Sequence, residues 1–130
     1  MSDSSEKSTG GSLPLKILFV CTANRMRSKT AEIIYQDDER FIVKSAGVAD
    51  FAQVPLNLEL LNWADYVVVM ETMHLEWIRE SYPVFYSQKH EKVLCLNIPD
   101  IYDFMDFELV YQIEQKFETR YKEEIQPGWI

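Results

Sequence analysis

The feature that most constrains this chain is a short apolar run that ends in a cysteine and leads into a helix-like segment. Residues 17–20 (Ile-Leu-Phe-Val) precede Cys21, Arg27 follows six positions later, and residues 28–35 have helical character. This order predicts a buried strand, a tight loop and the first turn of a helix. Such a loop directs backbone N–H groups inward at the positive end of a helix dipole, a setting that binds oxyanions such as phosphate.

Cys21 and Arg27 give this loop a nucleophile and an anion clamp. The field at a helix N-terminus favours thiolate over thiol, so Cys21 at the base of the loop is a candidate nucleophile. Arg27 is a cation at the start of a helix, which is unfavourable unless an anion lies beside it. Its planar fork matches two oxygens of a tetrahedral anion. The alternatives are a structural core cysteine and a solvated arginine. Together the two residues indicate phosphoryl transfer through a cysteinyl-phosphate.

Apolar runs alternate with helical patterns along the chain, and this alternation predicts an α/β fold. Strands are expected at 15–20, 41–44, 66–70 and 92–97, and helices at 28–35, 55–64, 72–81 and 107–125. Continuous apolar strands joined by long connections indicate a parallel sheet with helices on both faces, a three-layer architecture. The polar residues 1–14 predict a disordered tail, which leaves 15–130 as a single domain.

Composition narrows the range of partners and cofactors. The 130 residues carry a net charge of −8, which disfavours sequence-independent binding of nucleic acid. No apolar run approaches the roughly 18 residues that a membrane span needs. The two cysteines lie in different contexts and the two histidines lie far apart, which argues against a disulfide framework and a metal site. We therefore expect a reduced, cytoplasmic protein with no metal, no organic cofactor and no membrane or nucleic-acid partner.

Four markers spread along the chain resemble the low molecular weight protein tyrosine phosphatases. The Cys-x5-Arg loop has Asn24 at its middle and Ser28 after the arginine, a Ser-Ala-Gly turn lies at 45–47, and Pro-Asp-x-Tyr lies at 99–102. The resemblance implies the strand order 2-1-3-4, with the loop at the switch point where such sheets bind ligands. It also implies that phosphate is held by the loop residues Thr22, Ala23, Asn24, Arg25, Met26, Arg27 and Ser28.

The resemblance places the general acid at Asp100. This carboxyl would protonate the leaving oxygen and then activate water against the cysteinyl-phosphate. Asp103 is a competing carboxyl in the same loop. Asp106 is better explained as the cap of the last helix.

Other side chains are expected to hold the loop or to shape substrate binding. Asn24, Ser28 and Ser45 are support candidates: asparagine tolerates a left-handed backbone, and Ser28 can donate a hydrogen bond to the cysteine sulfur. Their alternative roles are turn former and helix cap. Tyr102 and Phe51 are expected to wall the cleft and to stack on an aryl substrate, with ordinary packing as the alternative.

The chain departs from the family pattern at a few positions. Arg25 replaces a residue that is usually apolar, and at the rim of the loop it would attract a second anionic group. The segment 47–65, which lines the rim in the family, is short here, so the chain resembles a compact relative with an altered substrate range. We expect His74 and His90 on the surface and Cys95 buried and inert.

The sequence thus predicts a cysteine-dependent phosphomonoester hydrolase that resembles the protein tyrosine phosphatases. Its substrate would be a phosphorylated protein or a small aryl phosphate. Two alternatives stay open. An arsenate reductase-like enzyme shares the loop but needs further redox cysteines, and Cys95 is the other thiol. A phosphate- or phosphotyrosine-binding module with little turnover is the other alternative, because a fold does not guarantee a function.

Overall fold

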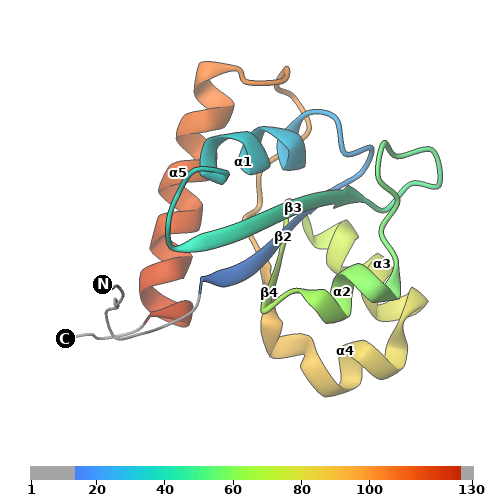
Figure 1. Ribbon diagram of the computed structural model, residues 1–130. Helices are drawn as coiled ribbons and strands as arrows, with labels where there is room; N and C mark the ends of the chain where they lie inside the picture. The colour runs from blue at the N-terminus through green and yellow to red at the C-terminus, as the bar shows by residue number, and fades with distance from the viewer. Residues whose placement is uncertain (1–13, 127–130) are drawn as a thin grey trace.

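A four-stranded parallel sheet forms the centre of the molecule (Figure 1). The computed structural model describes residues 14–126. The strands are β2 (Leu15–Cys21), β3 (Phe41–Gly47), β4 (Tyr66–Val69) and β5 (Val93–Cys95). They lie in the order β3-β2-β4-β5, with every neighbouring pair parallel. In chain order this is second, first, third, fourth, so the predicted architecture is confirmed.

Helices cover both faces of the sheet, as the apolar strands require. One face carries α1 (Arg27–Tyr35) and α5 (Phe107–Arg120), which a short π-helix, Tyr121–Ile125, extends. The other face carries α2 (Leu58–Trp63), α3 (Thr72–Ser81) and α4 (Pro83–Lys89), and the short 3-10 helix His90–Lys92 leads into β5. Successive residues of a strand point to opposite faces. Ile17 and Phe19 of β2 therefore join the first core, and Leu18 and Val20 join the second.

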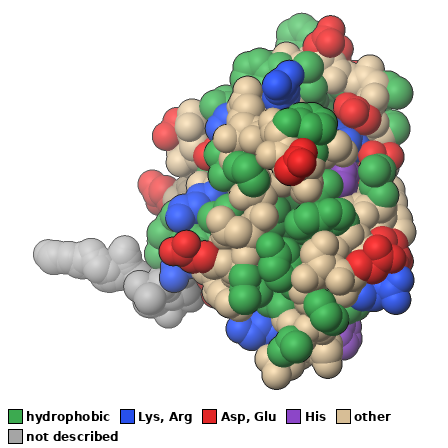
Figure 2. Space-filling model, turned by 90° about the vertical axis from the view of Figure 1, so that its right-hand side faces the viewer, with side chains coloured by type: hydrophobic (Ala, Val, Ile, Leu, Met, Phe, Trp, Pro, Cys, Tyr) green, Lys and Arg blue, Asp and Glu red, His purple; other side chains and the backbone are tan. Residues whose placement is uncertain are grey.

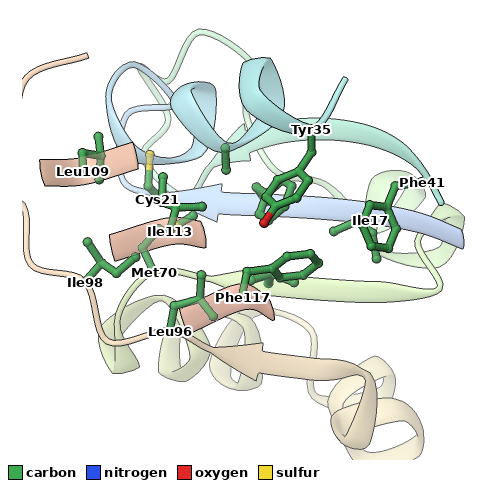
Figure 3. Packing of buried hydrophobic residues seen from close by; sticks show 13 residues of the cluster. Ile17, Cys21, Tyr35, Phe41, Met70, Leu96, Ile98, Leu109, Ile113 and Phe117 are labelled. Atoms are coloured by element: carbon green, nitrogen blue, oxygen red, sulfur yellow. The ribbon is translucent and has the colours of Figure 1, made fainter. Parts of the chain in front are cut away.

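Cys21 lies at one end of the first core. Figure 3 shows it beyond the apolar side chains of β2, with Phe41 at the opposite end of the cluster. Aromatic rings of β2, α1 and α5 pack between them: Phe19 and Tyr35 are stacked, and Phe117 packs edge to face on Phe19 with ring centroids 5.4 Å apart. Cys21 itself is 3 % exposed. The candidate nucleophile therefore sits at the tip of a fully packed strand, which restricts its motion.

Two prolines lie close to the starts of helices. The helix expected from residue 55 begins at Leu58, and Pro55 pairs with Gly47 in an isolated bridge. The side chain of Asn57 provides the cap by accepting from the Leu60 N–H at 2.8 Å. Pro83 begins α4, because its fixed φ suits the first helical position.

The polar tail predicted over residues 1–14 lies, apart from Pro14, outside the described residues. Within residues 14–126, no helix is both long and apolar enough to span a membrane.

Candidate active site

The loop between β2 and α1 turns its carbonyl groups outward. The carbonyl oxygens of Cys21, Thr22 and Ala23 accept hydrogen bonds of 3.0, 3.0 and 3.1 Å from backbone N–H groups of the segment 48–53. In a planar trans peptide, the N–H points opposite to the carbonyl. The N–H groups of residues 22–24 therefore point away from that segment, toward the inside of the loop. This is the arrangement that an oxyanion needs.

Gly47 allows the two segments to approach this closely. A Cβ atom at this position would lie 2.4 Å from the carbonyl oxygen of Thr22 and 2.8 Å from the backbone nitrogen of Asn24. Both contacts are with backbone atoms, which cannot move without opening the loop. The Ser-Ala-Gly turn noted in the sequence thus has a physical reason for its glycine.

Asn24, Ser28 and Cys21 form a hydrogen-bonded chain inside the loop. Asn24 has φ = 57°, the left-handed region that asparagine tolerates. Its amide nitrogen donates to the Ser28 hydroxyl at 2.8 Å, and that hydroxyl lies 3.0 Å from the Cys21 sulfur. Since the Ser28 oxygen accepts from Asn24, its own hydrogen is free to point at the sulfur. The two support candidates are therefore brought together at the cysteine.

Arg27 is buried and held by two oxygens. Its Nη1 donates to Glu71 Oε1 at 2.6 Å and to the carbonyl oxygen of Ile98 at 2.8 Å. Glu71, the residue just before the helix expected at 72–81, is the N-cap of α3. A glutamate carboxylate can both accept from the first turn of α3 and reach the arginine. The guanidinium is thus fixed from two segments that follow β4 and β5.

His74 is completely buried, so the prediction that it lies on the surface is wrong. Its Nδ1 accepts the backbone N–H of Glu71 at 3.0 Å. The ring proton is therefore on Nε2, which lies 2.9 Å from the hydroxyl of Thr22 and donates to it. Burial, together with the nearby Arg27, lowers the pKa of His74 to about 4, which keeps the ring neutral near pH 7. His74 thus ties α3 to the residue that follows Cys21.

The position of His74 in the sequence, rather than its residue type, indicated a structural role. Glu71 and His74 stand three positions apart at the start of a helix, the spacing of a capping box, and the structure has both reciprocal bonds. The contact to Thr22 had no such signal, because it spans 52 positions of sequence.

A cavity of about 250 Å³ opens at the loop, and it contains the three predicted catalytic residues. Its lining residues are Cys21, Thr22, Ala23, Arg25, Met26, Arg27 and Asp100. Asp100 Oδ1 lies 3.8 Å from Nε of Arg27, and its side chain is 62 % exposed. Asp103 does not line this cavity, and Asp106 caps α5 by accepting from the Glu108 N–H at 2.8 Å.

Asn24 and Ser28 belong to the loop but are fully buried and do not line the cavity, and three other predicted residues lie outside the loop and do not line it. Ser45 is buried, but its hydroxyl donates to Glu32 of α1 at 2.5 Å rather than to the loop. Tyr102 is partly buried against the first core, and Phe51 is 67 % exposed. Neither aromatic ring lines the cavity, so their contact with an aryl substrate stays a prediction.

The part of the chain that the structure describes has no group of three or more His, Cys, Asp or Glu side chains positioned to hold a metal ion. Cys95, expected to be buried, is half-buried on β5 and its sulfur lies 3.4 Å from Oδ1 of Asn97.

Comparison with known proteins gives a uniform result at the level of structure. No family model matches the chain, and no curated protein matches it by sequence. YwlE arginine phosphatase from Geobacillus stearothermophilus aligns with a TM-score of 0.63 at 24 % identity, over 90 % of this chain and 99 % of that one. SP-PTP, a low molecular weight protein tyrosine phosphatase from Streptococcus pyogenes, aligns with a TM-score of 0.66 at 18 % identity, over 86 % and 96 %.

A third structure, a low molecular weight protein tyrosine phosphatase from Bacillus subtilis, aligns with a TM-score of 0.60 at 25 % identity, over 84 % of this chain and 99 % of that one. The alignments cover nearly the whole of each of these phosphatases. The sheet order, the loop after β2 and these alignments agree: the chain has the fold of the low molecular weight protein tyrosine phosphatases.

Proposed function

We propose that this chain is a phosphomonoester hydrolase of the protein tyrosine phosphatase kind that works through a cysteinyl-phosphate. The observation that carries the proposal is the convergence of Cys21, Arg27 and Asp100 on one cavity, although Asp100 is 79 positions from Cys21 in the sequence. A nucleophile, an anion clamp and an acid are the three groups that the reaction needs. No step requires a metal or an organic cofactor.

In the first step, the Cys21 thiolate attacks phosphorus in line with the ester oxygen. The sulfur–phosphorus bond forms as the phosphorus–oxygen ester bond breaks. Loop amides and Arg27 stabilise charge on the three remaining oxygens, and Ser28 donates its hydrogen bond to the sulfur. Asp100 gives its proton to the leaving oxygen, which departs as a neutral phenol or alcohol.

In the second step, water attacks phosphorus and the sulfur–phosphorus bond breaks. The Asp100 carboxylate, left by the first step, removes a proton from this water. Phosphate leaves, Cys21 is a thiolate again, and Asp100 has regained its proton. The exposure of the Asp100 side chain gives both the leaving group and water access to it.

The substrate class that we propose is an aryl phosphate, either phosphotyrosine in a protein or a small molecule. Two of the similar structures carry names of tyrosine phosphatases and one that of an arginine phosphatase, so the shared chemistry is cleavage of a phosphoryl group. A catalytic thiolate needs reducing surroundings, which supports a cytoplasmic location.

The position of Cys95 argues against an arsenate reductase. Cys95 lies on β5 and Cys21 at the end of β2, with β4 between them. Two strand spacings amount to about 10 Å, whereas a disulfide requires Cα atoms within about 7 Å. These two thiols cannot pair without a rearrangement of the sheet.

Hydrolysis of p-nitrophenyl phosphate and of a phosphotyrosyl peptide should survive excess EDTA and be inhibited competitively by vanadate. The reason is that the proposed site binds a tetrahedral or trigonal oxyanion through N–H groups alone. Initial rates at mildly acidic pH, with and without chelator, make the test. Vanadate binding without any turnover would indicate the binding module instead, and loss of activity in EDTA would indicate a metal phosphatase.

Glu71→Gln should lower kcat by about tenfold while KM falls or stays unchanged. The substitution keeps an acceptor for Arg27 but removes the charge that fixes the guanidinium. The more positive site still binds anions, yet its clamp is less well oriented. A general loss of folded protein would also lower the apparent kcat at an unchanged KM, so circular dichroism of the variant measures the folded fraction alongside the rates. Unchanged kcat would mean that Arg27 does not depend on Glu71.

A further inference from the structure

Arg25 provides an uncompensated positive charge at the cavity. It lines the cavity and is exposed, and among residues 14–126 no carboxylate forms an ion pair with it. The charge of Arg27, in contrast, is already balanced by Glu71 at 2.6 Å, and Asp100 lies 3.8 Å from it. The local balance of positive and negative charge at the cavity therefore depends on Arg25.

The place of Arg25 in the chain makes an unpaired cation costly. It lies two residues before α1, at the positive end of the helix dipole, where a cation is unfavourable until an anion comes close. The base of the loop is at Cys21, which is 3 % exposed, whereas Arg25 is an exposed part of the lining. Its guanidinium is thus available to the part of a substrate that lies beyond the transferred phosphate.

The surface of the molecule does not supply a broad positive electrostatic field that would mask the effect of Arg25 on anionic substrates. Figure 2 shows the side of the molecule toward which the strands point in Figure 1, and on it acidic and basic side chains are scattered among apolar and uncharged ones. The chain as a whole is acidic, with a net charge of −8. A preference for anions at the cavity mouth would therefore come from a single residue, which makes it testable by one substitution.

We propose that Arg25 is a specificity residue that selects phosphomonoesters carrying a second anionic group close to the ester. This inference rests on the proposed hydrolase function and names its substrate class. The second group is a carboxylate or another phosphate. An acidic residue next to phosphotyrosine provides it in a peptide, and a ring carboxylate provides it in a small aryl phosphate.

Two matched substrate pairs test the proposal. The first pair is a phosphotyrosyl peptide with aspartate on both sides of the phosphotyrosine and the same peptide with asparagine. The second pair is 3-carboxyphenyl phosphate and its 3-carboxamide. At low ionic strength the wild type should have a kcat/KM about fivefold higher for the charged member of at least one pair, the size of a favourable exposed ion pair. The pair with the larger preference identifies whether the recognised group belongs to a peptide or a small molecule.

Variants assign the preference to Arg25. Arg25→Gln should bring the ratio of kcat/KM between the charged and the uncharged member of a pair to about one, whatever it does to the rate with both members, while Arg25→Lys should keep most of the preference. Lys122→Gln is the matched control, because it also removes one positive charge but far from the cavity. Lys122 follows Tyr121, whose ring packs on Phe41 at the opposite end of the sheet. This variant should keep the full preference. Raising the salt to 0.5 M should weaken the wild-type preference, because ions screen exposed charges.

Two outcomes overturn the inference. One is an equal kcat/KM for charged and uncharged members in the wild type, and the other is a preference that Arg25→Gln retains. In both cases the uncharged substrates are still hydrolysed, so the proposed function stands. If the protein hydrolyses neither p-nitrophenyl phosphate nor any member of the two pairs, the proposed function itself is contradicted. This outcome differs from the two above, in which hydrolysis remains.

Discussion

Cys21→Ser should reduce hydrolysis of every phosphomonoester by at least about 10³-fold and leave the fold intact. A serine hydroxyl is not ionised near neutral pH, and Asp100, the carboxyl that lines the cavity, must keep its own proton in this step to protonate the leaving oxygen. The oxygen is smaller than sulfur but can still accept the hydrogen bond from Ser28, so the loop keeps its internal contacts. Steady-state rates with p-nitrophenyl phosphate, together with circular dichroism, measure both parts of this prediction.

Cys95→Ser is the matched control for this substitution. It changes the other thiol to the same residue, on a strand that is separated from β2 by β4. Its activity should stay within about twofold of the wild type, because surface-side substitutions away from a site have small effects. Turnover by Cys21→Ser within tenfold of the wild type would remove Cys21 as the nucleophile.

The loop was predictable because the residues that determine its structure and its chemistry lie within a few consecutive positions. The run into Cys21, the six-residue step to Arg27 and the start of a helix are local features, and local features survive in almost any tertiary context. Asn24 illustrates the same point. Its φ is left-handed, and asparagine is the residue type in this loop that tolerates such a backbone best. The order of the strands could not be predicted from the hydrophobic pattern and came from the resemblance to the family.

The residues that surround the loop were harder to predict, because their contacts join distant parts of the chain. Glu71 meets Arg27 across 44 positions and His74 meets Thr22 across 52. A polar residue at the start of a helix usually faces water, and only the approach of α3 to the loop buries His74. Ser45 was expected at the loop because it lies in the right turn, yet a side chain of α1 offers its hydroxyl a nearer acceptor, Glu32.

Asp100→Asn should slow hydrolysis of phosphotyrosine by about 10²- to 10⁴-fold, the usual contribution of a general acid. A substrate with an activated leaving group, such as p-nitrophenyl phosphate, should lose much less. The reason is that a basic phenolate cannot depart without a proton, whereas nitrophenolate nearly can. Asparagine keeps the size of the side chain at the cavity but has no proton to give. The decisive measurement is the ratio of the two losses in kcat, with both substrates assayed on the same preparation.

Asp103→Asn is the matched control, since Asp103 belongs to the same exposed loop but does not line the cavity. It should change neither substrate by more than about twofold. If Asp103→Asn instead gave the leaving-group dependence, Asp103 would be the acid. The Pro-Asp-x-Tyr correspondence would then be displaced on this chain.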